Sequence, residues 1–406
     1  MDMKYDKTIC IGGKNSIAVN AMQFLCSRIP KSNLLFIPNR EDTGINGWQP
    51  SFKKFCTLKD IKETTLEELQ DTPDIIFISL EYDRIIKPNK FLSSELFNIH
   101  FSLLPKYKGM YTSALPILNG ETSSGVTLHK IDHGIDTGDI ISQIDFEISI
   151  TDTAEDLYKK YLHNSFLLFK ENIENLINET YQKKPQPPLN SSYYSKKSID
   201  YSNISIDLNK TAFEILNQFR AFTFRNYQLP KFQEWEISKC SITEEKSSLK
   251  PAEIIKEDEY EFKISTIDYN VTLKKDYYFM LYKAAKDNNI QDLKKAIYFV
   301  DDIDLREKNG WTALIIATFN GNIEAVELLV SAGANPSATN YKGTTVLMYA
   351  FSNYEKTRDE SIFKIILKAG ANPNATDDSG KDILTYMHER KCTDLVNLIN
   401  QPNKTN

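Results

Sequence analysis

A side-chain amide and an imidazole stand two residues apart in Asn98-Ile-His100, directly after an apolar run and shortly before Pro105. On an extended backbone, residues i and i+2 point to the same face, so Asn98 and His100 can converge on one small substrate atom. An amide that holds a developing oxyanion and an imidazole that takes up a proton are two parts of an acyl-transfer site. The alternative is a strand end whose His and Asn cap the following loop.

A second polar cluster follows in Asp132-His-Gly-Ile-Asp136-Thr-Gly-Asp. Its glycines permit a tight loop, which could carry the Asp136 carboxylate to the sheet edge where open parallel sheets bind ligands. Beside His100, this carboxylate would raise the basicity of the imidazole and could shuttle protons. An Asp-rich turn between two strands is the structural alternative.

His129 and His133 have the four-residue spacing of a metal-binding pair on a helix. Because this segment is predicted as a strand followed by a glycine loop, we favour a structural role and expect no metal.

Short apolar runs alternate with helical patterns in the first half of the chain. Strands are predicted at residues 7–13, 34–39, 74–80, 96–101, 124–131 and 139–148, and helices at 16–29 and 153–178. This alternation indicates an α/β fold with an open, mostly parallel sheet covered by helices. We assign residues 1–200 to a catalytic domain, in which the proline- and serine-rich segment 183–197 is predicted to be a linker.

Two smaller regions follow. Residues 201–276 predict a small mixed α/β middle domain, with a helix at 211–222 and short strands near 262–267 and 269–275. Beyond it, NIQDLKKAI at 289 recurs as NIEAVELLV at 322, 33 residues later, whereas AGANP recurs after 37, so one repeat carries an insertion of four. Two helices and a glycine turn every 33 residues are the ankyrin pattern, which predicts an all-α repeat domain over residues 277–402. Three to four repeats fit this length, with the outer ones as caps.

Composition and charge limit the binding partners and the cellular compartment that can be expected for the protein. A net charge of −6 over 406 residues favours neither nucleic-acid nor membrane-surface binding, and no apolar run has the length of a membrane span. The N-terminus does not have the pattern of a signal peptide. Five scattered cysteines are typical of reduced thiols. We therefore expect a cytoplasmic protein.

Taken together, Asn98-x-His100-x-Ser-Leu-Leu-Pro and Asp132-x-Gly-x-Asp136-Thr-Gly resemble the formyltransferase family that uses 10-formyltetrahydrofolate. The gap of 36 residues between His100 and Asp136 also matches, and the resemblance covers roughly residues 1–200. It implies that a substrate amine attacks the formyl carbon, with His100 as base, Asn98 stabilising the oxyanion and Asp136 orienting the base. It further implies that the folate is held by apolar residues and by the main chain near the loop of residues 132–139, which we call the Asp loop. The expected contacts are Ser102, Leu103, Leu104, Asp132, Gly134, Gly138 and Asp139.

The charge of the middle domain limits the classes of formyl acceptor that can be expected. Family members that act on methionyl-tRNA carry a basic C-terminal domain, whereas residues 201–275 contain 11 Lys/Arg and 12 Asp/Glu, a net charge of −1. The middle domain resembles that of members acting on nucleotide-linked amino sugars. The implied acceptor is a dTDP-linked amino-dideoxyhexose, with its amine at position 3 or 4, for bacterial surface polysaccharide such as the O-antigen of lipopolysaccharide. The alternatives are a UDP-amino sugar, methionyl-tRNA, or a non-catalytic ankyrin scaffold.

Acceptor-binding residues are predicted from the same resemblance. Sugar formyltransferases stack an aromatic side chain on thymine, and Tyr227 is the candidate here, with core packing as its alternative. Arginine and asparagine side chains could contact base or phosphate oxygens. The full set of further candidates is Tyr82, Arg84, Lys106, Arg220, Arg225 and Asn226.

The ankyrin repeats predict a binding surface for a protein. Trp311 is expected in a turn before a repeat helix, where an exposed indole would suggest a binding spot, either for a protein or for a second nucleotide-sugar. Large residues also occur at this turn for structural reasons. The resemblance further implies a homodimer.

Overall fold

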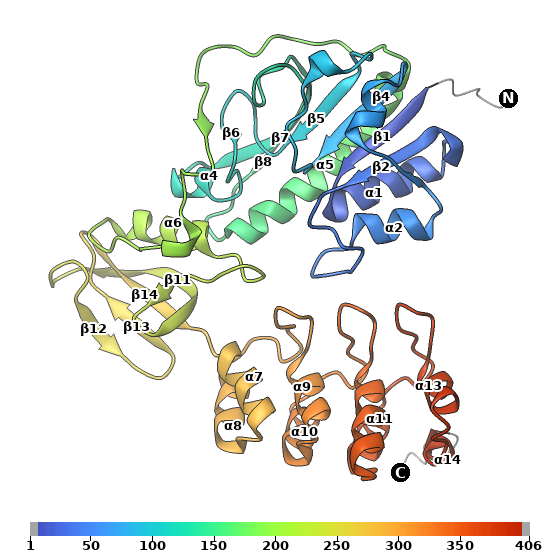
Figure 1. Ribbon diagram of the computed structural model, residues 1–406. Helices are drawn as coiled ribbons and strands as arrows, with labels where there is room; N and C mark the ends of the chain where they lie inside the picture. Colours follow the sequence, from blue (N-terminus) through green and yellow to red (C-terminus); the bar gives the residue numbers. More distant parts are fainter. Residues whose placement is uncertain (1–6, 400–406) are drawn as a thin grey trace. The chain divides into compact units, whose positions relative to one another are not determined.

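The structure, a computed structural model, describes residues 7–399 (Figure 1). The chain divides into two compact units, with the boundary between Lys274 and Lys275. Within the described residues, no helix combines the length and the apolar composition needed to cross a membrane.

The first unit is built around a seven-stranded sheet. In chain order its strands are β1 (Thr8–Gly13), β2 (Leu34–Pro38), β3 (Lys62–Glu63), β4 (Ile75–Leu80), β5 (Leu96–His100), β7 (Ser123–Lys130) and β8 (Ile140–Glu147). Their spatial order is β3-β2-β1-β4-β5-β7-β8. Strands β1 to β5 are paired in parallel, whereas β7 and β8 continue the sheet antiparallel to β5 and to each other. The predicted open, mostly parallel sheet is confirmed.

Both faces of this sheet carry an apolar core, because successive side chains of a strand point to opposite faces. Ile9 and Ile11 belong to the core on one face, whereas Cys10 belongs to the core on the other. The helices of this part are α1 (Asn15–Cys26), α2 (Phe52–Leu58), α3 (Leu66–Gln70), α4 (Leu115–Leu118) and α5 (Ala154–Ile177), with short 3₁₀ turns at Lys31–Asn33, Pro88–Lys90 and Tyr201–Asn203. Helix α5 begins at a capping box formed by Thr153 and Asp156.

The strand order reverses between β1 and β4, which are adjacent in the sheet although β2 and β3 separate them in sequence. Ligands of open α/β sheets bind outside the carboxyl ends of the strands at such a switch point. Strand β5, which carries Asn98 and His100, lies directly beside β4, so both residues reach this edge.

The predicted middle domain contains one helix and an antiparallel sheet. Helix α6 (Ala212–Phe222) packs against a five-stranded sheet with the order β10-β11-β14-β13-β12. The strands are β10 (Lys231–Phe232), β11 (Trp235–Lys246), β12 (Ile254–Glu257), β13 (Glu261–Ile264) and β14 (Tyr269–Lys275). The expectation of only short strands was incomplete, because β11 spans 12 residues. Its apolar residues do not alternate regularly, so the period-2 signal of a strand is weak there.

The prediction that residues 183–197 form a linker is wrong for the part that follows Lys183. Lys184 forms a β-bridge with Ile140, and β9 (Tyr193–Tyr194) pairs in parallel with β6 (Lys108–Gly109). A Pro/Ser-rich composition disfavours long regular elements, but it does not prevent isolated backbone hydrogen bonds to a neighbouring strand or loop.

The second unit consists, within residues 275–399, of successive helix pairs. They are α7 (Tyr278–Asp287) with α8 (Ile290–Phe299), α9 (Ala313–Asn320) with α10 (Ile323–Ser331), α11 (Val346–Thr357) with α12 (Ser361–Lys368), and α13 (Ile383–Glu389) with α14 (Val396–Ile399). The insertion of four lies in α11, which has 12 residues where α9 has 8. Residues 400–402 of the predicted repeat domain lie outside the described residues.

Trp311 is partly buried in this unit, which agrees with a structural reason for a large residue at this turn. Its ring lies 5.0 Å from the rings of both Phe319 and Tyr349, measured between centroids. The ammonium of Lys356 lies 4.7 Å above the ring of Phe319. Trp311 therefore belongs to an aromatic cluster that connects successive repeats.

Candidate active site

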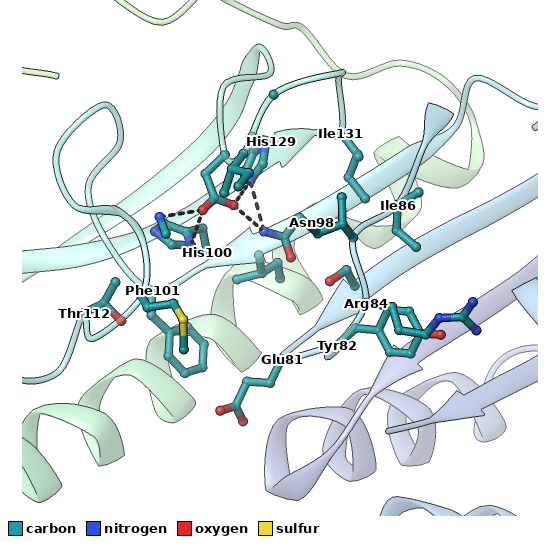
Figure 2. Close-up of a pocket in the computed structure, with 18 of the residues that line it drawn as sticks. Glu81, Tyr82, Arg84, Ile86, Asn98, His100, Phe101, Thr112, His129 and Ile131 are labelled. Carbon is teal, nitrogen blue, oxygen red and sulfur yellow. Dashed lines mark hydrogen bonds and ion pairs between the residues drawn. The ribbon is translucent and has the colours of Figure 1, made fainter. Parts of the chain in front are cut away.

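Strand β5 carries Asn98 and His100 on the face opposite to Phe97 and Ile99, which pack into the core. The antiparallel pairing of β5 with β7 sets His129 directly opposite Asn98. Figure 2 shows that Asn98, His100 and His129 converge on the same point above the strand. The predicted convergence of the first two residues is thus observed, together with a third residue that we had interpreted as structural.

The Asp loop brings its carboxylate to this point. Asp136 has a positive φ of 54°, and the Asp132 carboxylate orders the loop by accepting a 2.6 Å hydrogen bond from the Thr137 hydroxyl. At Gly138 a Cβ atom would lie 1.9 Å from the backbone oxygen of Lys130, so only glycine fits where the loop leaves the strand. The two-glycine pattern therefore has a steric reason at this position.

Four groups surround the Asp136 carboxylate. His100 Nδ1 lies 3.4 Å from Oδ2, and His129 Nε2 lies 3.6 Å from Oδ1. The Asn98 amide donates to Oδ1 at 3.3 Å, and the backbone N–H of Gly109 donates to Oδ2 at 2.9 Å. Figure 2 draws the contacts of Asn98, His100 and His129 with this carboxylate as dashed lines. Hydrogen bonds from Asn98 of β5 and from the backbone of Gly109 in β6 therefore hold the carboxylate, with both imidazoles beside it.

Hydrogen bonds to neighbouring carbonyl groups determine which ring nitrogen of His100 and of His129 carries the proton. His100 Nε2 donates to the backbone oxygen of Tyr107 at 2.8 Å, so Nδ1 carries the lone pair in the neutral ring. His129 Nδ1 donates to the backbone oxygen of Lys130 at 2.7 Å, which leaves Nε2 to accept the Asn98 amide at 3.1 Å. The basic nitrogen of His100 and the amide of Asn98 thus both face Asp136.

Burial and charge determine the ionisation of the pair. Burial lowers the pKa of His100, and the nearby Asp136 and the Tyr107 carbonyl offset only part of that shift. Burial alone would raise the pKa of Asp136, but the two imidazoles and the Gly109 amide outweigh it and hold the pKa below its usual range. Near neutral pH the site contains a neutral imidazole beside a carboxylate, which is the state a general base requires.

These groups line a cavity of about 590 Å³. Its other walls come from the end of β4, the segment after β6, the Asp loop, and Tyr193, Ser195 and Lys196. In Figure 2, Tyr82, Arg84, Ile86 and Ile131 lie on one side of Asn98, whereas Phe101 and Thr112 lie on the other, below His100. The cavity therefore offers an apolar half and a second half that opens past the imidazole.

Glu81 also lines this cavity, and sequence reasoning missed it. It follows β4 directly and has a φ of +57°, a strained conformation that is typical of functional sites. Its carboxylate accepts hydrogen bonds from the Tyr158 hydroxyl at 2.9 Å and the Asn15 amide at 3.3 Å. Burial raises the pKa of Glu81 to about 7. A charged residue directly after a fully buried, mostly apolar strand was the available sequence signal.

Several predicted folate contacts lie outside the cavity lining. Asp132 and Gly134 line it, whereas Ser102, Leu103, Leu104, Gly138 and Asp139 do not. Ser102 is buried and donates to the backbone oxygen of Lys106, and Asp139 lies 3.4 Å from Lys183. These residues shape the two loops and do not face the cavity.

Of the residues predicted to bind the acceptor, too, only some line the cavity. Tyr82 and Arg84 line the cavity, whereas Lys106 and Arg220 do not. Lys106 pairs with Glu121 at 3.1 Å. The buried Arg220 donates to the Ser149 carbonyl at 2.8 Å and lines a separate cavity of about 340 Å³ between α6 and β11.

Tyr227 projects from the segment after α6 and is 62% exposed. Its ring lies 5.8 Å from that of Trp48 and 4.7 Å from that of Phe224, and Trp48 also contacts Tyr158 at 5.9 Å. Through Tyr158 this aromatic cluster reaches Glu81. Trp48 is a second residue that the sequence did not single out, because it lies in a loop far from the motifs.

The two residues before Tyr227 are anchored to α5. The Glu155 carboxylate accepts from the Arg225 backbone at 2.9 Å and from the Asn226 amide at 3.2 Å. The Asn226 amide is thereby directed toward α5.

Within residues 7–399, no group of three or more His, Cys, Asp or Glu side chains is arranged to hold a metal ion. His129 and His133 in particular belong to no such group.

Comparisons with known proteins agree with this geometry. The model of the formyl transferase family matches residues 51–171, and a model of ankyrin repeats in three copies matches residues 281–398. The solved structure of WlaRD, a sugar 3-N-formyltransferase in the presence of dTDP and 5-N-formyl-THF, is 48% identical, and the match covers 66% of this chain and 97% of WlaRD with a TM-score of 0.63. The chain belongs to the sugar N-formyltransferase family.

A second sugar N-formyltransferase gives the same result. The N-formyltransferase from Helicobacter canadensis, in complex with folinic acid and dTDP-3-aminofucose, is 46% identical over 66% of this chain and 99% of its own, with a TM-score of 0.62. Methionyl-tRNA formyltransferase of Francisella philomiragia is 34% identical over 161 residues, which is 39% of this chain. The chain spans about half the length of such curated relatives, since the match covers 50% of that protein.

Proposed function

We propose that this sugar N-formyltransferase moves the formyl group of 10-formyltetrahydrofolate to the 3-amino group of a dTDP-linked amino-dideoxyhexose. The observation that carries the proposal is the convergence of Asn98, His100 and Asp136 in one cavity of a chain that is 48% identical to a sugar 3-N-formyltransferase. The relative from Helicobacter canadensis, at 46% identity, was solved with dTDP-3-aminofucose, which favours position 3 over position 4.

The cavity fits the co-substrate. Ile85, Ile86, Ile131 and Ile135 line its apolar half, next to backbone groups of the Asp loop. A flat heteroaromatic ring with hydrogen-bonding edges suits such a pocket. Tyr82 and Arg84 lie on this side in Figure 2, so contact with the folate suits them better than the contact with the sugar that we expected from the sequence.

The residues can perform the transfer as follows. Folate supplies an activated formyl group. His100 Nδ1 takes a proton from the attacking amine, and the Asp136 carboxylate at 3.4 Å stabilises the imidazolium. The proton then goes to the folate nitrogen that leaves. Asn98 offers the formyl oxygen the N–H that now contacts Asp136 at 3.3 Å, because its bond to His129 at 3.1 Å is the shorter one.

We infer that the acceptor half of the site extends from His100 toward the aromatic cluster, whose Trp48 and Tyr227 lie outside the lining of the catalytic cavity. Tyr227 is exposed enough to stack on thymine, and Trp48 stands edge-on to its ring. We assign the catalytic role to residues 1–200 and a contribution to nucleotide-sugar binding to residues 201–276. Lys106, Arg220, Arg225 and Asn226 have protein partners or lie away from the cavity, so we give their predicted contacts less weight.

The biological setting is part of the proposal. We infer a cytoplasmic homodimer that supplies a formylated sugar for bacterial surface polysaccharide, such as the O-antigen of lipopolysaccharide. The ankyrin repeats, over residues 277–402, are proposed to bind a protein or a second nucleotide-sugar near Trp311. Isothermal titration of the full chain with dTDP tests the latter. Two sites, of which Trp311→Ala removes one, are expected, and a single site would contradict it.

A panel of acceptors tests the proposed substrate. dTDP-3-amino, dTDP-4-amino and UDP-amino sugars and methionyl-tRNA are compared at a fixed concentration of 10-formyltetrahydrofolate. The proposal predicts the highest kcat/KM for a dTDP-3-amino sugar. A preference for any other acceptor would overturn the assignment of the substrate and leave the formyl transfer itself intact.

A further inference from the structure

Residues 184–194 follow α5 and contact two loops, the Asp loop and the loop of residues 105–109. We name this segment the strap. Lys184 exchanges two 2.8 Å backbone hydrogen bonds with Ile140 of β8. Two residues later, the side-chain amide of Gln186 donates 2.8 Å hydrogen bonds to the backbone oxygens of Asp136 and Gly138. The start of the strap is therefore attached to the loop that carries the catalytic carboxylate.

The end of the strap is attached to the second of these loops, residues 105–109. The Ser192 hydroxyl accepts a 2.8 Å hydrogen bond from the backbone N–H of Tyr107, and the Ser192 carbonyl accepts one of 2.9 Å from Lys108. Ser192 also donates its own N–H to the carbonyl of Pro105 at 3.2 Å. The rings of Tyr107 and Tyr194 stack at 5.6 Å.

The backbone of this second loop contacts the side chains of His100 and Asp136. The Tyr107 carbonyl accepts from His100 Nε2 at 2.8 Å, and the Gly109 N–H donates to Asp136 Oδ2 at 2.9 Å. Gly109 has a φ of +88°, and a Cβ atom there would lie 2.2 Å from the backbone oxygen of Tyr194. Glycine is thus required because the strap approaches so closely.

We propose that two residues of the strap are positioning residues of the active site: Ser192 orients His100 through Tyr107, and Gln186 orients Asp136 through its loop. This inference rests on the proposed function and goes beyond it. Displacing a catalytic group by about 1 Å can reduce a rate by about 10²-fold, so anchors of this kind control turnover without touching the substrate.

Serine variants with a matched control test the first half. Ser192→Ala removes the acceptor for the Tyr107 N–H, whereas Ser191→Ala removes only a 3.1 Å contact from the exposed Lys108 ammonium. For Ser192→Ala we expect kcat to fall about tenfold with KM within about twofold, whereas Ser191→Ala retains full turnover. Ser192→Thr keeps a hydroxyl and should restore most of kcat.

A second readout does not depend on the reaction. The Tyr107 carbonyl stabilises the charged imidazole, so withdrawing it should lower the pKa of His100, while Asp136 and His129, the other titratable groups that face the ring, stay in place. NMR titration of histidine-labelled protein, with the signal assigned from its loss in His100→Gln, measures this pKa. It should fall in Ser192→Ala and not in Ser191→Ala.

The second half is tested with Gln186→Met, which keeps the length of the side chain and removes both donors, against Gln182→Met at an exposed position. We expect a lower kcat and a lower pKa of His100 only for Gln186→Met. Wild-type values of kcat and of this pKa in both Ser192→Ala and Gln186→Met would overturn the strap proposal. If the unaltered protein transfers no formyl group, the proposed function fails, and the titration alone decides the role of the strap.

Discussion

The amide nitrogen of Asn98 donates to His129 Nε2 at 3.1 Å across the antiparallel pair of β5 and β7. Because His129 Nδ1 is committed to the Lys130 carbonyl, Nε2 can only accept, and it selects the orientation in which the nitrogen of Asn98 points toward Asp136. His129 is therefore a positioning residue for the group proposed to hold the oxyanion.

Replacing His129 tests this relationship. His129→Leu removes the acceptor and lets the Asn98 amide turn, so we expect kcat to fall about 10- to 100-fold, up to the lower end of the roughly 10²- to 10³-fold loss that removing an oxyanion donor causes. His129→Gln retains an acceptor oxygen and should recover part of the loss. His163→Leu, at an exposed position of α5, is the control and should leave kcat unchanged. Equal kcat for His129→Leu and the control would contradict the positioning role.

The charge of Asp136 should be visible in the pH profile. Asp136 raises the pKa of His100, so Asp136→Asn lowers that pKa, and the rise of kcat/KM with pH should move to lower pH. Turnover should fall about 100-fold, because the imidazolium loses its counter-charge. The profile is measured with both substrates saturating and again at low acceptor. An unshifted rise in Asp136→Asn would mean that His100 is not the titrating base.

Motifs that are short in sequence could be predicted, whereas contacts made by sheet pairing could not. Asn98 and His100 share one strand, and Asp136 lies in one glycine loop, so residue type and spacing sufficed. His129 required the register of β5 against β7, which no local pattern specifies. Ser192 acts through backbone contacts in a stretch whose composition is typical of a linker.

Arg220 is a predicted acceptor residue that lies outside the lining of the catalytic cavity. Its sequence neighbourhood suggested an acceptor contact, but α6 presents it away from the catalytic cavity, toward β11 and the Ser149 carbonyl. The longer strands of the main sheet and the helices α1 and α5 were predictable because each is a distinct apolar run with one period, whereas β3, α2 and α3 were not predicted. The long strand β11 was not, because its apolar residues are irregularly spaced.

Glu81 gives a prediction for stability. Its pKa is raised from 4.5 to about 7 on folding, so between these values the folded state binds more protons than the unfolded state. The free energy of unfolding contributed by Glu81 therefore decreases as pH rises through this window. Glu81→Gln should be more stable than the wild type at pH about 8, with the difference vanishing near pH about 4.5.

Urea denaturation at several pH values measures this difference. Glu244→Gln, at an exposed position of β11, is the control for replacing a glutamate elsewhere in the chain. A Glu81→Gln midpoint that follows the wild type at every pH would contradict the unfavourable burial of this carboxyl.

Tyr227 should control binding of the nucleotide part of the acceptor. Stacking of a base on an aromatic ring contributes about 1–3 kcal/mol, so Tyr227→Ala should raise KM for the acceptor about tenfold or more while kcat stays within about twofold. Tyr227→Phe keeps the ring and should behave as wild type. Tyr298→Ala, at a position that is 82% exposed, controls for loss of an aromatic side chain elsewhere. An unchanged KM in Tyr227→Ala would exclude the stacking role.

Formyl transfer itself is the most direct test of the account. The protein is incubated with 10-formyltetrahydrofolate and a dTDP-3-amino-dideoxyhexose, and the nucleotide-sugar product is identified by mass spectrometry. The account predicts N-formylated sugar in equal amount to the tetrahydrofolate released, and no product from His100→Gln although that variant still binds the folate. No product from the unaltered protein, or wild-type turnover in His100→Gln, would contradict it.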